Sequence, residues 1–149
     1  MTLFEELVAV VQALETAGID YALVGGLAVG VWGAPRATKD IDLLVMPSDV
    51  RRAKECLHPH GYTLEALPMK FSDGMKLERV SKIVAGATMT VDFILVDPNL
   101  QPTWNSREWR AADTFRICVV SRDALIAMKL AAGRPQDQAD VIKLTEQDR

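Results

Sequence analysis

Three aspartates in two apolar, strand-like segments constrain this chain more than any other feature. Asp40 and Asp42 alternate with apolar residues in segment 39–45, and Asp92 interrupts the apolar segment 89–96. Side chains of an extended strand alternate between its two faces, so Asp40 and Asp42 point to one side while their apolar neighbours point into the core. Two carboxylates about 7 Å apart repel by about 2–3 kcal/mol at an effective dielectric constant of about 20. A third carboxylate adds to this repulsion, and the cluster therefore predicts a divalent metal site.

Composition predicts one domain of ordinary size over residues 1–149. Hydrophobic residues make up 49% of the chain, which is enough for a substantial core. The net charge of −3 and the pI near 5.4 argue against an overall basic surface for nucleic acid, although a local basic patch stays open. No apolar run approaches the roughly 18–20 residues of a membrane span, and the polar start is unlike a signal peptide. We therefore expect a cytoplasmic protein without a membrane partner, and reduced, structural roles for the distant Cys56 and Cys118.

Periodicity and end signals predict alternating helices and strands. The expected helices cover residues 3–14, 27–32, 49–59, 121–130 and 135–144, and the expected strands cover 21–24, 40–45, 62–64, 76–80, 89–96 and 115–120. Residues 104–112 fit either a short helix or a loop, and Gly86-Ala87 marks a hairpin connection. The order predicts an α/β (α+β) fold, in which helices lie against a mixed sheet within a single domain.

Gly25 and Gly26 follow a predicted strand and open a predicted helix. Glycines at such a turn let backbone amides approach an anion, and the positive end of the helix dipole helps to bind it. A glycine pair alone is usually no more than a turn. Here the Asp-x-Asp strand begins fourteen residues after Gly26 and a third strand aspartate follows, and chance seldom supplies that ordered set.

This ordered set resembles the nucleotidyltransferase superfamily typified by DNA polymerase beta. The superfamily is marked by a helix-opening Gly-Gly or Gly-Ser, an Asp-x-Asp strand and a later strand acid, matched here by Gly25-Gly26, Asp40-Ile41-Asp42 and Asp92. Its minimal, abortive-infection-toxin-like branch is a narrower resemblance, carried by segments 21–28, 36–43 and 128–140. The resemblance spans about residues 3–144.

The resemblance implies metal-dependent transfer of a nucleoside monophosphate from a nucleoside triphosphate (NTP), such as ATP, to a protein, a tRNA end or a small molecule. Asp40 and Asp42 would hold a Mg²⁺ or Mn²⁺ ion that bridges the triphosphate, with the amides of Gly25 and Gly26 around its outer phosphates. Asp92 would share a second ion and help to deprotonate the acceptor hydroxyl. Such sites use oxygen ligands, so they need no cluster of cysteine and histidine.

Four cationic residues are candidates for phosphate binding, and each has a structural alternative. Arg36 and Lys39 flank the acidic strand, where solvation or pairing with aspartate competes with a phosphate role. Lys129 is placed to offset the charge of the triphosphate, so we group it with Arg36 and Lys39 as nucleotide-binding. For Arg134 the alternative is an ion pair with Asp137 or Asp140.

Two departures from the family pattern leave three functions open. Many relatives have serine where this chain has Gly26, and larger relatives carry a helical domain for the base and the acceptor. Either NTP binding is weak, or a partner protein completes the site. The chain is then an active transferase, with a place in a toxin–antitoxin system, or a non-catalytic fold that binds a toxin–antitoxin partner. The third alternative is a metal-free scaffold whose aspartates pair with Arg36, Lys39 or Lys129.

Overall fold

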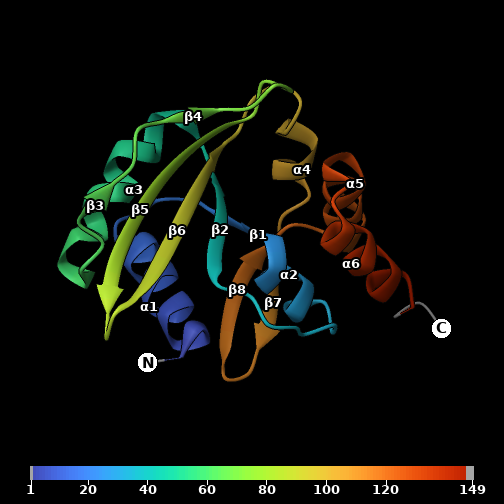
Figure 1. Cartoon of the computed structure of the whole chain (residues 1–149), viewed down its shortest axis with the longest axis horizontal. Coiled ribbons are helices and arrows are strands. Elements are labelled where there is room, and N and C mark those ends of the chain that lie inside the picture. The colour runs from blue at the N-terminus through green and yellow to red at the C-terminus, as the bar shows by residue number, and fades with distance from the viewer. Residues whose placement is uncertain (1, 147–149) are drawn as a thin grey trace.

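The computed structural model describes residues 2–146 and contains a mixed sheet with helices on both faces (Figure 1). The strands follow the order β3-β5-β6-β2-β1-β8-β7, and β4 pairs with β5. β2 is parallel to β6, β1 is parallel to β8, and the other pairs are antiparallel. The strands are β1 (Ala22–Val24), β2 (Asp40–Val45), β3 (Leu64–Glu65), β4 (Met69–Lys70), β5 (Lys76–Val84), β6 (Ala87–Leu95), β7 (Glu108–Ala112) and β8 (Phe115–Val119).

Six α-helices in this part of the chain accompany the sheet. They are α1 (Leu3–Thr16), α2 (Gly25–Val31), α3 (Val50–Cys56), α4 (Gln101–Asn105), α5 (Arg122–Ala132) and α6 (Pro135–Glu146), with 3₁₀ turns at Pro47–Asp49 and His58–His60. The hydroxyls of Thr2 and Ser121 cap α1 and α5 by accepting from backbone amides. Gly133 ends α5 with a φ of +66°. Within residues 2–146, no helix combines the length and the apolar character that crossing a membrane requires.

The two faces of β5 show which helices cover which side of the sheet. Glu78 and Lys82 pair with Lys54 of α3 and Glu6 of α1, so α1 and α3 cover the face to which these side chains point. Arg79 lies between them in the strand and points to the opposite face. That opposite face carries the candidate site, with α2, α5 and α6 beside it (Figure 1).

The expected fold class is confirmed, because the structure has a mixed sheet flanked by helices. Segment 104–112 corrects one expectation: it holds the end of α4 but also the strand β7, which pairs with β8. The side chains of β7 are exposed or half-buried, so no buried alternation marks this strand in the sequence. The predicted strand 62–64 is also displaced, since only Leu64–Glu65 pairs with β5, and the helix expected over 49–59 ends at Cys56.

Candidate functional site

Strand pairing gathers the three aspartates on one face of the sheet. In the parallel pair of β2 and β6, Asp42 lies directly opposite Asp92, and Asp40 lies opposite Thr90. Residues that face each other across a ladder share a face of the sheet, and so do residues two apart in one strand. Asp40, Asp42 and Asp92 therefore point to the same side. Asp92 is 4% exposed, so it forms the floor of this acidic cluster.

Gly25 brings the start of α2 against the acidic cluster. Its neighbour Val24 pairs with Asp42 across the antiparallel β1–β2 ladder, and α2 begins at once. Gly25 has a φ of +73°, and a Cβ atom there would lie 2.2 Å from Oδ2 of Asp42. A Cβ on Gly26 would lie 2.7 Å from Oγ1 of Thr38. At both positions glycine is required because a side chain would collide with a neighbouring residue. At Gly25 it is required also because the backbone is left-handed.

The surroundings of Asp42 disfavour the ionised form of its carboxyl group. Burial and the charges of Asp92 and Asp40 raise the pKa of Asp42 to about 7, although Lys129 and Arg134 partly offset the increase. Burial is the largest cause of this increase and the charges of Asp92 and Asp40 add to it, so a cation beside Asp42 would favour its ionised form. The cluster is therefore suited to bind a further cation.

Arg79 is the residue of this site that sequence reasoning missed. It lies opposite Asp92 in the antiparallel β5–β6 ladder. Its Nε donates to Oδ1 of Asp92 at 2.7 Å, and its Nη2 donates to Oδ2 at 3.0 Å. The hairpin predicted at Gly86 would have been enough to find this contact. If Val84 pairs with Ala87, the antiparallel register places Arg79 opposite Asp92.

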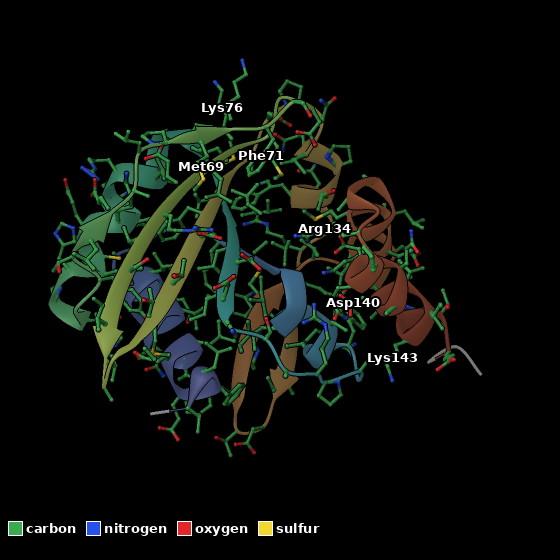
Figure 2. All side chains as sticks on the ribbon, viewed as in Figure 1. Met69, Phe71, Lys76, Arg134, Asp140 and Lys143 are labelled. Carbon is green, nitrogen blue, oxygen red and sulfur yellow. The ribbon has the colours of Figure 1, made fainter. Side chains whose placement is uncertain are left out.

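The predicted phosphate-binding cations lie mostly in a second cluster, beside α5 and α6. Arg36 makes a two-pronged pair with Asp140, at 2.8 and 2.9 Å. Lys129 contacts Asp137 at 3.3 Å and Asp140 at 3.0 Å, and Arg134 binds Asp137 at 2.6 Å. We call these five residues the C-terminal ion network; Figure 2 labels Arg134 and Asp140 within it.

The network combines buried anions with cations of unequal exposure. Asp137 and Asp140 are each 1% exposed and Lys129 is 7% exposed. Burial alone would raise the pKa of Asp140, but hydrogen bonds from Arg36, Lys129 and Gln136 lower it to about 2. Lys39 is outside the network and exposed. Lys129 and Arg134 nevertheless lie close enough to Asp42 to lower its pKa, so the network borders the acidic cluster.

Comparison with known proteins identifies this arrangement. The family described as "Nucleotidyltransferase of unknown function (DUF6036)" matches residues 1–146. The chain belongs to this nucleotidyltransferase family. The resemblance to the nucleotidyltransferase superfamily is thereby confirmed, and the chain is an enzyme of the nucleotidyl-transferring class. No curated protein matches the chain.

Solved structures share the fold of this nucleotidyltransferase at low identity. TM1012 of Thermotoga maritima, assigned as a nucleotidyltransferase, has a TM-score of 0.69 at 13% identity, covering 98% of this chain and 93% of its own. The lincosamide antibiotic adenylyltransferase LnuA, solved with lincomycin, has a TM-score of 0.66 at 15% identity, covering 95% of each chain. ANT(2″)-Ia with adenylyl-2″-tobramycin has a TM-score of 0.67 at 12% identity, covering 99% of this chain and 91% of that one.

The carboxylates of the nucleotidyltransferase fit a divalent cation in donor chemistry. Within residues 2–146, no group of three or more histidine, cysteine, aspartate or glutamate side chains has the arrangement that holds a metal ion. Both oxygens of Asp92 are engaged by Arg79. Aspartate oxygens are nonetheless the ligands that Mg²⁺ and Mn²⁺ prefer, and part of the increase in the pKa of Asp42 comes from the charges of Asp92 and Asp40. Asp40 and Asp42 are the residues that would hold the ion, and Asp92 would join them only by giving up a hydrogen bond from Arg79.

Proposed function

We propose that this nucleotidyltransferase moves a nucleoside monophosphate from a Mg²⁺- or Mn²⁺-bound NTP to a hydroxyl-bearing acceptor. One observation carries the proposal: Asp42 lies opposite Asp92 in adjacent parallel strands, with the backbone of Gly25 packed against its carboxylate. The start of α2 thus adjoins the acidic cluster. That arrangement supports binding of the outer phosphates beside a metal held by Asp40 and Asp42.

The chain's residues would serve three tasks in the reaction. The divalent ion, when bound, neutralises the triphosphate and polarises the α-phosphate. The acceptor oxygen forms a bond to the α-phosphorus, the bond from that phosphorus to the bridging oxygen breaks, and pyrophosphate leaves. The hydroxyl proton passes to a carboxylate, and Asp92 on the floor of the cluster is our candidate. Because Arg79 donates to both of its oxygens, one of these hydrogen bonds must open before Asp92 can accept the proton. Lys129 and Arg134, at the border of the cluster, are the cations best able to offset the leaving pyrophosphate.

Thermal unfolding with each NTP, with and without Mg²⁺ or Mn²⁺, tests the binding half of the proposal. A ligand at 100 times its dissociation constant adds about 2.7 kcal/mol of stability. We expect a metal-dependent stabilisation that Asp42→Asn abolishes and Asp49→Asn keeps, because Asp49 pairs with Arg52 next to α3, away from the acidic cluster. Equal stabilisation of all three proteins would contradict the proposal.

Incubation with α-labelled NTP and candidate acceptors tests the transfer half. Two structural neighbours were solved with lincomycin and with adenylyl-2″-tobramycin, so small molecules rich in hydroxyl groups are the first acceptors to test, followed by tRNA and protein. Label transferred by the wild type and lost in Asp42→Asn supports the proposal.

A second candidate function is nucleotide binding without turnover, in a fold that acts through a partner protein such as the other half of a toxin–antitoxin pair. The contact between Arg79 and Asp92 favours it, because an arginine that takes both oxygens of the third aspartate competes with a second metal ion. Metal-dependent NTP binding with no transfer to any acceptor class would select this alternative.

A further inference from the structure

The free edge of β7 offers hydrogen-bonding groups that no other strand in residues 2–146 uses. β7 is the last strand at its end of the sheet order. The opposite end is formed by β3 and β4, which have two residues each, whereas β7 has five. Short edge strands resist pairing with another chain, and longer ones invite it. The edge of β7 is therefore the better candidate for strand addition.

The backbone of β8 shows which residues of β7 point outward. The amide of Cys118 donates to the hydroxyl of Tyr21, and the amide of Val120 donates to Leu23 of β1, so both amides point away from β7. Trp109 pairs with Cys118 across the β7–β8 ladder. Trp109 and Cys118 are thus a non-hydrogen-bonded pair, in which the backbone N–H and C=O groups of each residue point away from the other strand. The N–H and C=O groups of Trp109, and by the same alternation those of Ala111, face the open edge.

The charged side chains of β7 favour pairing with the β7 strand of a second copy, and they favour one register of that pairing. Glu108 and Arg110 flank Trp109 on the same face of the strand, where their side chains are 43% and 44% exposed and lie 3.8 Å apart as an ion pair within the strand. A second β7 antiparallel to the first, with the two-fold axis at Trp109, sets Glu108 opposite Arg110 of the second copy, twice. An axis at Arg110 would instead set like charges opposite each other, which is unfavourable.

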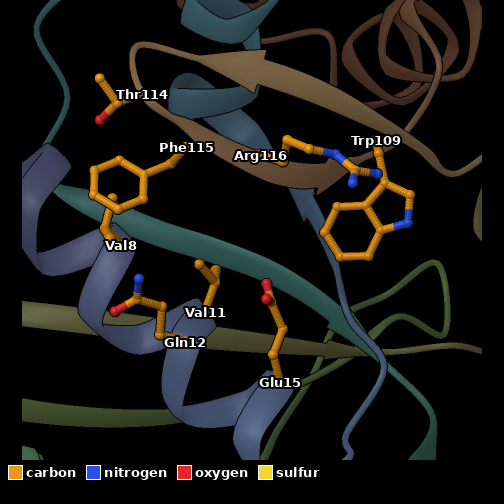
Figure 3. Close-up of a pocket in the computed structure, with 8 residues that line it drawn as sticks. All are labelled: Val8, Val11, Gln12, Glu15, Trp109, Thr114, Phe115 and Arg116. Carbon is orange, nitrogen blue, oxygen red and sulfur yellow. The ribbon is translucent and has the colours of Figure 1, made fainter.

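Apolar surface next to this edge supports the same partner. Trp109 is 49% exposed and Phe115 is 38% exposed. They border a groove of about 400 Å³ between the β7–β8 hairpin and α1, with Val8, Val11 and Glu15 on the helix side (Figure 3). With the axis at Trp109, the two indole rings would lie side by side on this face and cover one another.

We propose that two copies of this chain associate through antiparallel pairing of their β7 strands, centred on Trp109. The paired backbones exchange hydrogen bonds at Trp109, two Glu108–Arg110 pairs fix the register, and the sheet continues from one copy into the other. A five-residue strand pair buries less than the roughly 1,200–2,000 Å² of a standard interface, so we expect a weak, concentration-dependent dimer. The proposal is independent of the proposed function.

Sedimentation equilibrium from about 10 µM to 1 mM tests the pairing, since small interfaces form weak complexes. We expect the dimer fraction of the wild type to rise over this range. Glu108→Arg and Arg110→Glu each turn two attractive pairs into two repulsive ones, which should weaken the dimer about tenfold. The double variant restores opposite charges and should recover the wild-type dissociation constant within about threefold.

Amide hydrogen exchange shows whether the dimer uses this edge. Protection of the Trp109 and Ala111 amides should increase with protein concentration, whereas Arg110, whose amide points towards β8, is an internal control. A wild type that stays monomeric, single variants that dimerise normally, a double variant no better than either single one, or Trp109 protection independent of concentration would each overturn the proposal. Circular dichroism of the variants checks that their fold is retained.

Discussion

Arg79 and Asp92 form a two-pronged ion pair across the β5–β6 ladder, at 2.7 and 3.0 Å. The Arg79 side chain is 40% exposed and that of Asp92 is 6% exposed, so the arginine reaches from the solvent to the buried floor of the acidic cluster. Of the three aspartates, Asp92 alone faces an arginine across a strand ladder. The guanidinium occupies the place of a cation beside Asp92, which makes Arg79 a competitor of any metal ion that needs this carboxylate.

Replacing Arg79 by glutamine should destabilise the protein without metal and increase the effect of metal. The change leaves Asp92 short of its charged donor, so we expect the free energy of unfolding to fall by about 1–3 kcal/mol. Mn²⁺ should then stabilise Arg79→Gln more than it stabilises the wild type. Urea unfolding with and without Mn²⁺ measures both effects. Arg51→Gln, which removes an exposed pair with Glu65, is the control and should behave like the wild type. Equal stabilisation by Mn²⁺ in all three proteins would refute competition between Arg79 and the metal.

The raised pKa of Asp42 predicts a loss of stability as the pH increases. The folded state holds this proton up to about pH 7, whereas an unfolded aspartate releases it near the ordinary pKa of 3.8. Between these values the folded state binds more protons, so the free energy of unfolding falls as pH rises. At about 1.4 kcal/mol per pKa unit, we expect a decrease of about 3–4 kcal/mol from pH 4 to pH 8 in the difference between wild type and Asp42→Asn. Urea unfolding across this range measures it, and a difference that is flat with pH would contradict the assignment.

Gly25→Ala should damage the site through a steric clash as well as through backbone strain. The new Cβ would lie 2.2 Å from Oδ2 of Asp42, at a φ of +73°. Gly18 is a matched control, because it has a φ of +71° and a Cβ atom there would meet nothing within 4 Å. We expect Gly18→Ala to cost about 1 kcal/mol of stability, and Gly25→Ala about 1–2 kcal/mol more. The metal-dependent NTP stabilisation should be lost only in Gly25→Ala. Equal costs in the two variants would show that the approach to Asp42 does not matter.

Much of the acidic cluster could be predicted from local pattern, because alternation in a strand fixes which side chains share a face. That rule gives the common face of Asp40 and Asp42 directly. It does not give the parallel pairing that sets Asp42 opposite Asp92, since α3 and three strands separate β2 from β6 in the chain. For that step, resemblance to a known family supplied what local pattern lacks.

Long-range partners were the part that sequence could not supply. Arg36 and Asp140 are separated by 104 positions, and no local period links them. The pairing of Arg134 with Asp137 could be predicted from the sequence, because the two residues are three positions apart at the start of α6. The edge strand β7 could not be predicted for another reason. Its side chains do not alternate between buried and exposed, although its backbone pairs with β8 along its whole length.

Asp140→Asn should uncouple the C-terminal ion network. Asp140 is 1% exposed and accepts from both Arg36 and Lys129, so the variant leaves a buried lysine short of one partner. Removing one member of a buried ion pair typically costs about 3–5 kcal/mol, and we expect the lower part of this range because Arg36 is partly exposed. Arg36→Gln is the second arm of a double-mutant cycle, measured by urea unfolding. The two changes should be non-additive by about 1–3 kcal/mol, since each removes the same contact. Additive costs would show that Arg36 and Asp140 do not stabilise each other, and the network would then need another explanation.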